Sequence, residues 1–248
     1  MSESTSSGEA LPHPVLHGAS ALVVGASRGI GEAVARSLAA AGARVYVAAR
    51  SIDILRGIAE DIGGKALSMD LLNPSSVSTA LDQLTDDLAS APDIVVNAAG
   101  IFQIASVTDT PLKVFEEAWA TNLRGPFMVL RTLLPSMIAR GSGTVVTVGS
   151  VADSKPFPGN AAYSSAKYGL RGFHEVMVEE LRGSGVRSCL IAPAATDTAL
   201  WDPIDPDANP KLPDRAQMLR PVDIAKAVVF VCSLPTDVQV PVLAIERC

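Results

Sequence analysis

The stretch A-S-A-L-V-V-G-A-S-R-G-I-G, residues 19–31, decides the fold. Its first six residues are a short, mostly apolar run, which is typical of a strand buried in a parallel sheet. Glycines follow at Gly25, Gly29 and Gly31, where they let the backbone turn sharply. From residue 29 to 41 the apolar positions fall on one helical face. The stretch therefore predicts a strand, a glycine turn and a helix.

The glycine turn has the chemistry of a site for a dinucleotide pyrophosphate. The first N–H groups of a helix have no partner within it, and the helix dipole adds a partial positive charge. The spacing here is G-x-x-x-G-x-G, not the G-x-G-x-x-G of the standard fingerprint. Alone, such a turn could be only a tight connection. Its place at the first strand–helix junction favours a cofactor site that includes Ser27, Arg28 and Ile30.

The alternation of strand and helix continues along the chain. Short apolar runs predict strands at 44–48, 66–69, 93–96, 144–148, 186–191 and 238–245. Amphipathic stretches predict helices at 52–62, 74–89, 112–122, 124–139, 160–182 and 221–233, with an interruption near Gly125-Pro126. This order is typical of a doubly wound α/β domain, in which helices cover both faces of a parallel sheet.

No shift in composition marks a boundary between domains, so residues 15–248 are predicted to form one domain. Residues 1–14 are rich in Ser, Glu, Gly and Pro and are predicted to be a flexible tail without the features of a signal peptide. The region of about 193–220 holds five prolines and no sustained periodicity. We expect it to be a loop that covers the substrate.

Composition and charge exclude several classes of function. The net charge is −6 and aromatic residues make up 4% of the 248 residues, which argues against a nucleic-acid surface. No apolar run reaches the roughly 18 residues of a membrane-spanning helix. The three cysteines and three histidines have neither disulfide nor metal-site spacing. We therefore expect no metal, no membrane partner and a reducing, cytoplasmic setting.

Two arginines indicate which dinucleotide is bound. NAD sites usually place an acid at the end of the second strand, but this strand ends with Arg50. Arg50 and Arg28 together would suit the 2′-phosphate of NADP(H), because guanidinium groups bind phosphate bidentately. Arg50 could also be an ordinary solvated residue at a helix start.

Further candidate cofactor residues follow the third and fourth strands. Asp70 could accept a hydrogen bond from an adenine amino group, or could simply start a turn. Asn97, Ala98, Ala99 and Gly100 come after the fourth strand. Small residues there would let the backbone lie against the cofactor, although the tetrapeptide alone could be a strand-ending turn.

Three polar residues indicate the chemistry. Tyr163 and Lys167 lie four residues apart in a predicted helix and so share one face. Ser150 follows the fifth predicted strand. A Tyr–Lys pair is common on ordinary helix surfaces, and a serine at a strand end is often a cap. Their occurrence together with the cofactor turn favours a catalytic group.

Taken together, these residues resemble the short-chain dehydrogenase/reductase family, across about residues 19–245. The resemblance rests on Gly25, Gly29, Gly31, Asp70, Asn97, Ala98, Ala99, Gly100, Asn122, Ser150, Tyr163, Lys167 and Pro193, which occur in the family's order. Two positions depart from the family pattern: Val24 replaces a threonine, and Ala98 replaces an asparagine. The resemblance implies a Rossmann-like, three-layer fold of seven parallel strands, a nicotinamide cofactor and a homotetramer or homodimer. The helices that hold Asn122 and Tyr163 would form the subunit interface.

The resemblance also implies roles for the site residues. Tyr163 would donate or accept the proton, and Ser150 would orient the substrate oxygen. Lys167 would lower the pKa of the phenol and hold the nicotinamide ribose, and Asn122 would position Lys167 through a bound water. Further cofactor contacts would come from Leu71, Pro193, Thr196 and Thr198.

These inferences predict an NADP(H)-dependent oxidoreductase, a carbonyl reductase that interconverts a ketone or aldehyde and an alcohol. The alternative is a 3-oxoacyl-[acyl-carrier-protein] reductase, although the C-terminus lacks the Gly-Gly turn usual in those enzymes. A second alternative is a non-catalytic NADP-sensing protein, which the retained Tyr163 and Lys167 disfavour.

The substrate itself is not predicted beyond a moderately apolar carbonyl compound. Trp201 is expected to contact it, although the indole could also merely anchor the loop. Asp153 and Lys155 are interpreted as loop charges. Further candidate wall residues are Phe102, Val151, Phe157, Leu200 and Ile204.

Overall fold

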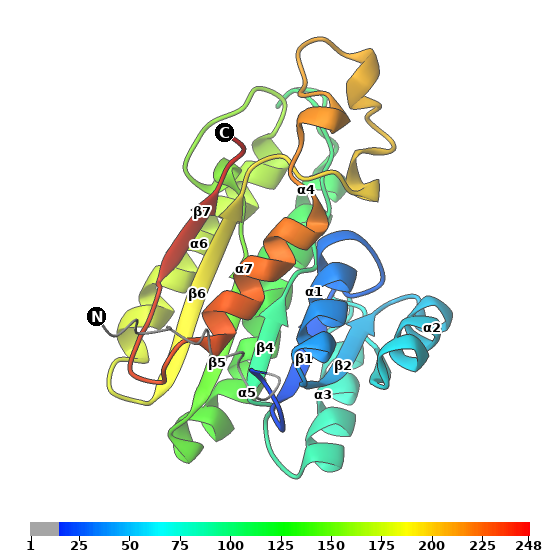
Figure 1. Cartoon of the computed structure of the whole chain (residues 1–248). Coiled ribbons are helices and arrows are strands. Elements are labelled where there is room, and N and C mark those ends of the chain that lie inside the picture. Colours follow the sequence, from blue (N-terminus) through cyan, green and yellow to red (C-terminus); the bar gives the residue numbers. More distant parts are fainter. Residues whose placement is uncertain (1–14) are drawn as a thin grey trace, which may run out of the picture.

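Seven parallel strands form the central sheet of the computed structural model, which describes residues 15–248 (Figure 1). Their spatial order is β3-β2-β1-β4-β5-β6-β7, so the direction of winding reverses between β1 and β4. The doubly wound, seven-stranded sheet predicted above is confirmed. The predicted tail, residues 1–14, lies outside the described residues. The strands are β1 (Ser20–Val24), β2 (Arg44–Ala49), β3 (Lys65–Ser68), β4 (Ile94–Asn97), β5 (Gly143–Val148), β6 (Val186–Pro193) and β7 (Val242–Ile245).

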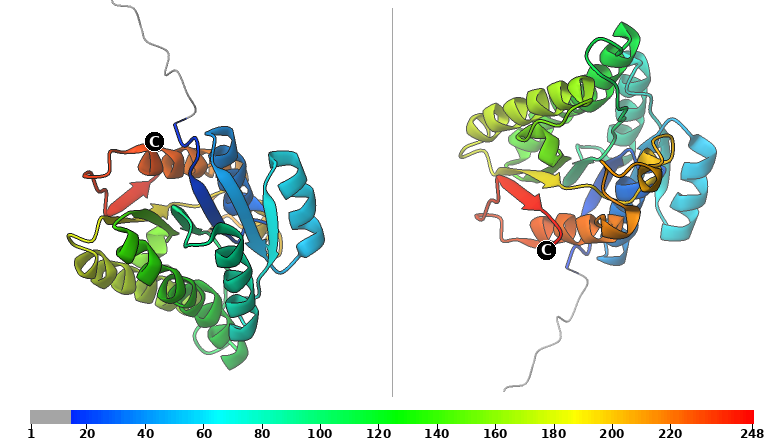
Figure 2. Two further views of the ribbon diagram at one scale, coloured as in Figure 1. Left: turned by 90° about the horizontal axis from the view of Figure 1, so that it is seen from below. Right: turned by 90° about the horizontal axis from the view of Figure 1, so that it is seen from above.

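Helices cover both faces of this sheet (Figure 2). One face carries α1 (Gly29–Ala40), α2 (Ile52–Ile62) and α7 (Pro221–Ser233), and the other carries α3 (Pro74–Leu88), α5 (Gly125–Arg140) and α6 (Ala161–Glu180). The short α4 (Leu112–Trp119) packs against α6.

Each central strand contributes to two hydrophobic cores, because successive side chains point to opposite faces. In β1, Ala21 and Val23 pack under α1 and α7, whereas Leu22 and Val24 pack under α3 and α5. Burial on both faces explains why the strands are continuous apolar runs in the sequence.

The helical region after β4 differs from the prediction. The interruption expected near Gly125-Pro126 does not exist, because α4 continues through a π turn, Ala120–Arg124, directly into α5. The backbone stays helical at Ala120 and at Gly125. Pro126 falls in the first turn of α5, where a missing N–H is tolerated. The widened turn places Asn122 inside the protein.

The last strand is shorter than predicted. It begins at Val242, which pairs with Leu190 of β6. Residues 238–241 form a connection in which the Val238 N–H bonds to the Pro235 carbonyl. The predicted long loop is confirmed as irregular, but it contains short 3₁₀ turns at Ala199–Trp201, Pro206–Ala208 and Arg215–Gln217.

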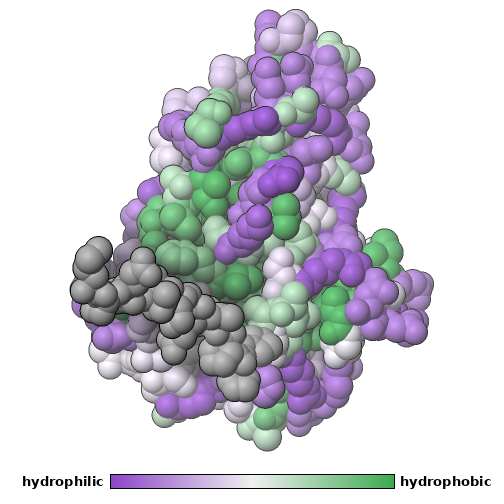
Figure 3. Space-filling view, viewed as in Figure 1, coloured by the Kyte–Doolittle hydropathy of each residue, from purple (hydrophilic) through white to green (hydrophobic). Residues whose placement is uncertain are grey.

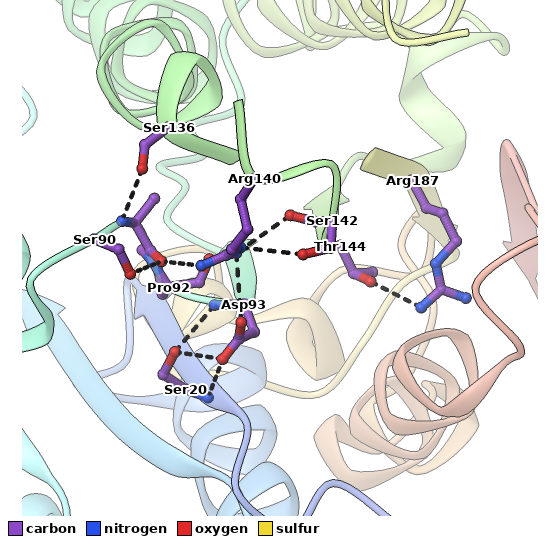
Figure 4. A network of polar contacts seen from close by, with 10 residues as sticks. Ser20, Ser90, Pro92, Asp93, Ser136, Arg140, Ser142, Thr144 and Arg187 are labelled. Atoms are coloured by element: carbon purple, nitrogen blue, oxygen red, sulfur yellow. Dashed lines mark hydrogen bonds and ion pairs between the residues drawn. The ribbon is translucent and has the colours of Figure 1, made fainter. Parts of the chain in front are cut away.

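A polar network stabilises the sheet at the end where the strands begin (Figure 4). The Asp93 carboxylate accepts hydrogen bonds from the Ser20 N–H at 2.8 Å and from its hydroxyl at 2.7 Å. Arg140 of α5 donates to the carbonyls of Ala91 and Pro92 at 2.7 and 3.1 Å. These contacts join β1, the start of β4 and α5 at the edge opposite to the cavity described below. Among residues 15–248, no helix is both long and apolar enough to cross a membrane.

Candidate active site

A cavity of about 1150 Å³ lies at the carboxyl ends of the strands. It runs from the glycine turn after β1, past the ends of β4 and β5, to the loop after β6. This is where open α/β sheets bind ligands, beside the point at which the strand order reverses. Most of the predicted site residues line it. Gly31, Asn97 and Asn122 do not contribute to its wall as formed by the described chain.

The glycine turn leaves no room for side chains. Gly25 has a φ of 86°, and a Cβ there would lie 2.5 Å from the backbone N of Ala99. A Cβ on Gly31 would overlap the Gly25 carbonyl. Arg28 is the N-cap of α1, and its side chain accepts no hydrogen bond from the helix in the described residues. The first N–H groups of α1 are therefore left without a side-chain acceptor beside the cavity. This cradle fits a pyrophosphate.

The part of the cavity wall near the end of β2 carries positive charge. Arg28 and Arg50 are both exposed and both line the cavity. Neither forms an ion pair within residues 15–248. Their guanidinium groups are therefore free to bind a phosphate.

Asp70 and the segment after β4 form the adjoining wall. The Asp70 carboxylate accepts from the Leu72 N–H at 3.0 Å, so it shapes the turn toward α3 as well as lining the cavity. Ala98, Ala99 and Gly100 line the cavity with backbone. Leu71, also predicted, lies in the same wall.

Two asparagines behind this wall have different environments. The Asn97 side chain is buried, and neither of its polar atoms has a hydrogen-bond partner in the part of the chain described. Asn122, on the π turn, accepts from the Ile101 N–H and donates to the Ile101 carbonyl, both at 3.0 Å. In this structure Asn122 therefore fixes the loop after Gly100, and these bonds do not link it to Lys167.

Ser150 lies at the end of β5 and caps a short turn, η2 (Val151–Asp153). Its Oγ accepts from the Ala152 N–H at 3.1 Å, which leaves the hydroxyl hydrogen free to donate into the cavity.

Tyr163 and Lys167 come from α6 and face the same space. Lys167 is 4% exposed, and its Nζ donates to the Val148 carbonyl at 2.8 Å. Burial lowers the pKa of Lys167 to about 8, and the negative charge of Asp153 acts in the opposite direction. The Lys167 Nζ lies 5.6 Å from the centre of the Tyr163 ring.

The pKa of Tyr163 differs from the expectation. We expected Lys167 to lower it, but burial raises the pKa of Tyr163 to about 12. The Ser150 hydroxyl opposes this increase and the Asp153 carboxylate adds to it. The largest cause is desolvation of the buried phenolate, and Lys167 is not among the groups that shift this pKa.

Aromatic side chains form the wall above the phenol. The Phe102 ring lies 4.9 Å from the Tyr163 ring and 5.2 Å from the Trp201 ring, edge to face in both cases. Phe157 and Leu200 also line this end. Val151 does so too, whereas Ile204 is not part of the wall among the described residues.

The interpretation of Asp153 as a loop charge is wrong. Its side chain is fully buried and lies 2.6 Å from Nη1 of Arg171 on α6. Sequence reasoning missed this pair, although Arg171 is one turn after Lys167 and so predicts an inward-facing cation that needs an acid. Lys155, in contrast, pairs with Glu246 at 2.8 Å on the cavity rim.

The loop after β6 closes the cavity, and Pro193, Thr196 and Thr198 all line it. The Thr198 side chain lies over the glycine turn, since its Cγ2 would be 3.1 Å from a Cβ on Gly29.

One arginine that the sequence did not single out holds this loop. Arg215 pairs with Asp197 at 2.7 Å and with Asp202 at 2.6 Å. Its backbone N–H also bonds to Asp207 at 2.7 Å.

Comparison with known proteins agrees with this geometry. The family pattern described as short chain dehydrogenase matches residues 19–209. A short chain dehydrogenase of Pseudocercospora fijiensis is 35% identical over 244 residues, which cover 94% of this chain and 77% of that protein. A 3-oxoacyl-[acyl-carrier-protein] reductase of Vibrio cholerae is 33% identical over 227 residues, covering 88% of this chain and 91% of that protein.

A solved structure, a metagenomic short-chain oxidoreductase in complex with NADP, superposes with a TM-score of 0.80 at 29% identity. The match covers 94% of this chain and 99% of that one. This chain belongs to the short-chain dehydrogenase/reductase family of oxidoreductases.

Proposed function

We propose that this protein is an NADP(H)-dependent carbonyl reductase that interconverts a ketone or aldehyde and the corresponding alcohol. The observation that carries the proposal is that Ser150, Tyr163 and Lys167 line the same cavity as the glycine turn and Arg50. One cavity can therefore hold the dinucleotide and bring a substrate to the three polar groups.

The residues present fit the cofactor. The glycine turn would hold the pyrophosphate, Arg28 and Arg50 the 2′-phosphate, and Ala98 to Gly100 would lie against its middle. The related oxidoreductase that superposes on this chain was solved with NADP, which supports the same choice here. When bound, the nicotinamide supplies or accepts the hydride.

The chain's own residues supply orientation and the proton. Ser150 donates its free hydroxyl hydrogen to the substrate oxygen, since its Oγ already accepts from Ala152. Tyr163 donates its phenolic proton to the same oxygen during reduction. Lys167 uses one N–H for Val148 and keeps two for the ribose hydroxyls and the charge that develops on the phenol. Asn122 holds the neighbouring wall in place.

The test is turnover of a carbonyl and alcohol panel with NADPH and NADP, for the wild type and for Tyr163→Phe. We expect the variant to bind NADPH normally by isothermal titration and to lose at least about 10²-fold in kcat, the range of a missing general acid. Near-normal turnover in the variant would remove Tyr163 from the mechanism. A wild type that binds NADPH but oxidises it with no panel member would favour the NADP-sensing alternative.

A second candidate substrate class is a 3-oxoacyl thioester. It is favoured by the 33% identity to the Vibrio cholerae reductase. It is disfavoured by the residues that follow β7, Glu246, Arg247 and Cys248, which contain no Gly-Gly turn. A carrier-bound or coenzyme A-bound 3-oxoacyl substrate in the same panel separates the two classes. We expect lower turnover of that substrate, because the aromatic wall of Phe102 and Trp201 favours a compact apolar carbonyl compound.

We also propose that the protein works in the cytoplasm as a homotetramer or homodimer. Exposed apolar side chains lie on α4, α5 and α6, among them Phe115, Trp119, Phe127 and Val176. A second apolar area covers β6, β7 and α7 on the face seen in Figure 3. Light scattering coupled to size exclusion tests the assembly, and Trp119→Asp should weaken the interface on α4. An unchanged mass would place the interface elsewhere.

A further inference from the structure

An ion pair with a buried carboxylate joins the short turn η2, which follows Ser150, to α6, and the mechanism proposed above does not use it. The Asp153 side chain has no exposed surface, and its Oδ1 is 2.6 Å from Nη1 of Arg171. Arg171 is 27% exposed and also bonds to Glu175 on its solvent side at 3.2 Å. Burial of a carboxylate is costly, and replacing such a pair by apolar groups is often neutral or stabilising, so stability alone does not explain it.

The pair connects the two elements that carry the catalytic residues. The Asp153 N–H bonds to the Ser150 carbonyl at 3.0 Å, and the Ser150 Oγ accepts from Ala152, so Asp153 ends the same short turn that Ser150 begins. Arg171 is one turn after Lys167 and two turns after Tyr163 on α6. The ion pair therefore links the Ser150 turn to the helix of the tyrosine and the lysine.

The second carboxylate oxygen, Oδ2 of Asp153, is buried and has no hydrogen-bond partner within the described chain. It lies 2.9 Å from where a Cβ on Gly149 would stand, next to the end of β5 to which Lys167 donates. Unpartnered buried oxygens are rare in folded proteins and call for an explanation. Here the charge raises the pKa of Lys167 against the effect of burial.

Other titratable groups around this space come from α6. They are Tyr163, Lys167, Arg171 and His174, with Glu175 behind Arg171. His174 is buried and bonds to the Pro241 carbonyl at 2.8 Å, and burial lowers its pKa, which favours the neutral form. Asp153 is thus the one carboxylate that acts on Lys167 among residues 15–248.

We propose that Asp153 and Arg171 are positioning residues of this active site: their ion pair holds Ser150 in place against α6, and the Asp153 carboxylate supplies the buried counter-charge of the Lys167 ammonium. The expected effect on turnover rests on the proposed oxidoreductase function. The expected effect on the pKa of Lys167 does not, because it depends only on the protein's own charges.

The experiment compares Asp153→Asn with Glu179→Gln, which removes an exposed carboxylate paired with Arg182 in the last turn of the same helix. In Asp153→Asn we expect the rate of reduction to decline at a pH lower by roughly one unit, which is the pKa shift typical of losing a nearby opposite charge. We expect kcat to fall about tenfold, with a smaller change in KM for the carbonyl. Asp153→Glu, which restores the carboxylate, should return the pH limit. The control should change neither.

The same shift is measured without turnover by following the 13Cε signal of Lys167 against pH, assigned with Lys167→Met. A lower midpoint in Asp153→Asn than in the wild type supports the proposal, and an equal midpoint overturns it. If Asp153→Asn does not fold, Asp153→Asn combined with Arg171→Gln removes both charges of the pair. Its midpoint should still lie below that of the wild type, although by less than for loss of the carboxylate alone, because loss of the Arg171 cation acts in the opposite direction. A wild type without carbonyl turnover contradicts the proposed function, whereas an unmoved Lys167 midpoint contradicts this assignment.

Discussion

Replacing Arg50 by Asp tests the cofactor choice most directly. Arg50 lines the cavity, is exposed and has no ion-pair partner among residues 15–248, so the substitution leaves no buried group unpaired. Exposed positions of this kind change the free energy of unfolding by about 0.5 kcal/mol or less. A change in kinetics would therefore report cofactor binding and not loss of folded protein.

The magnitude follows from the contact that is lost. A hydrogen bond to a charged group contributes about 1.5–3 kcal/mol, and exposure to solvent places Arg50 at the lower end. About 1.5 kcal/mol corresponds to roughly a tenfold decrease in kcat/KM for NADPH. Repulsion between the new carboxylate and the 2′-phosphate increases this to about 10–50-fold. NADH lacks that phosphate, so its kcat/KM should change by less than about threefold.

The assay is the ratio of kcat/KM for NADPH to that for NADH, at one ionic strength, because exposed charges are screened by salt. Arg56→Asp is the matched control. Arg56 is an exposed arginine on α2 that pairs with Asp53 and does not line the cavity. A ratio in Arg50→Asp equal to that of the control would refute the role given to Arg50.

Three further predictions concern the same cavity. Burial lowers the pKa of Lys167 to about 8, so the ammonium is lost as the pH rises through that value. The rate of NADPH-dependent reduction should therefore fall above about pH 8. A rate that rises from pH 7 to 9.5 would contradict this. Gly25→Ala places a Cβ against the Ala99 backbone at a positive φ. The substitution should lower the free energy of unfolding by about 1–3 kcal/mol, measured by thermal unfolding. It should also abolish NADPH binding, measured by titration calorimetry. Phe102→Ala removes the ring between Tyr163 and Trp201 and should raise KM for an aromatic ketone about 5–30-fold while leaving KM for NADPH unchanged; equal changes in both would argue against a substrate wall.

Local sequence patterns predicted most of the fold because the central strands are buried on both faces. β1 is therefore apolar from Ala21 to Val24, and β5 contains three valines and two buried threonines, Thr144 and Thr147. The glycine turn was also predictable, since its positive φ at Gly25 and close backbone contacts exclude other residues.

The errors come from features that local patterns do not encode. Gly125-Pro126 indicates a break, but the backbone stays helical through the π turn and Pro126 falls in the first turn of α5. Pairing with β6, not strand propensity, sets the start of β7.

The candidate site was predictable to the extent that its residues lie on regular elements. Tyr163 and Lys167 share a helix face, and Ser150 follows a strand. Asp153 and Arg171 are 18 residues apart and meet only in three dimensions. The raised pKa of Tyr163 depends on burial of the phenol, which the spacing of Tyr163 and Lys167 in the sequence does not reveal.

Because Arg215 holds the loop after β6 through ion pairs, the exchange of ligands at this cavity should depend on ionic strength. Asp197 and Asp202 hold the loop over the cavity through ion pairs at 2.7 and 2.6 Å, and both carboxylates are well exposed to solvent. Salt screens such pairs, whereas it acts little on the contact between the Trp201 and Phe102 rings. Added salt should thus loosen the outer part of the loop first and speed the exchange of ligands before it alters the chemistry inside.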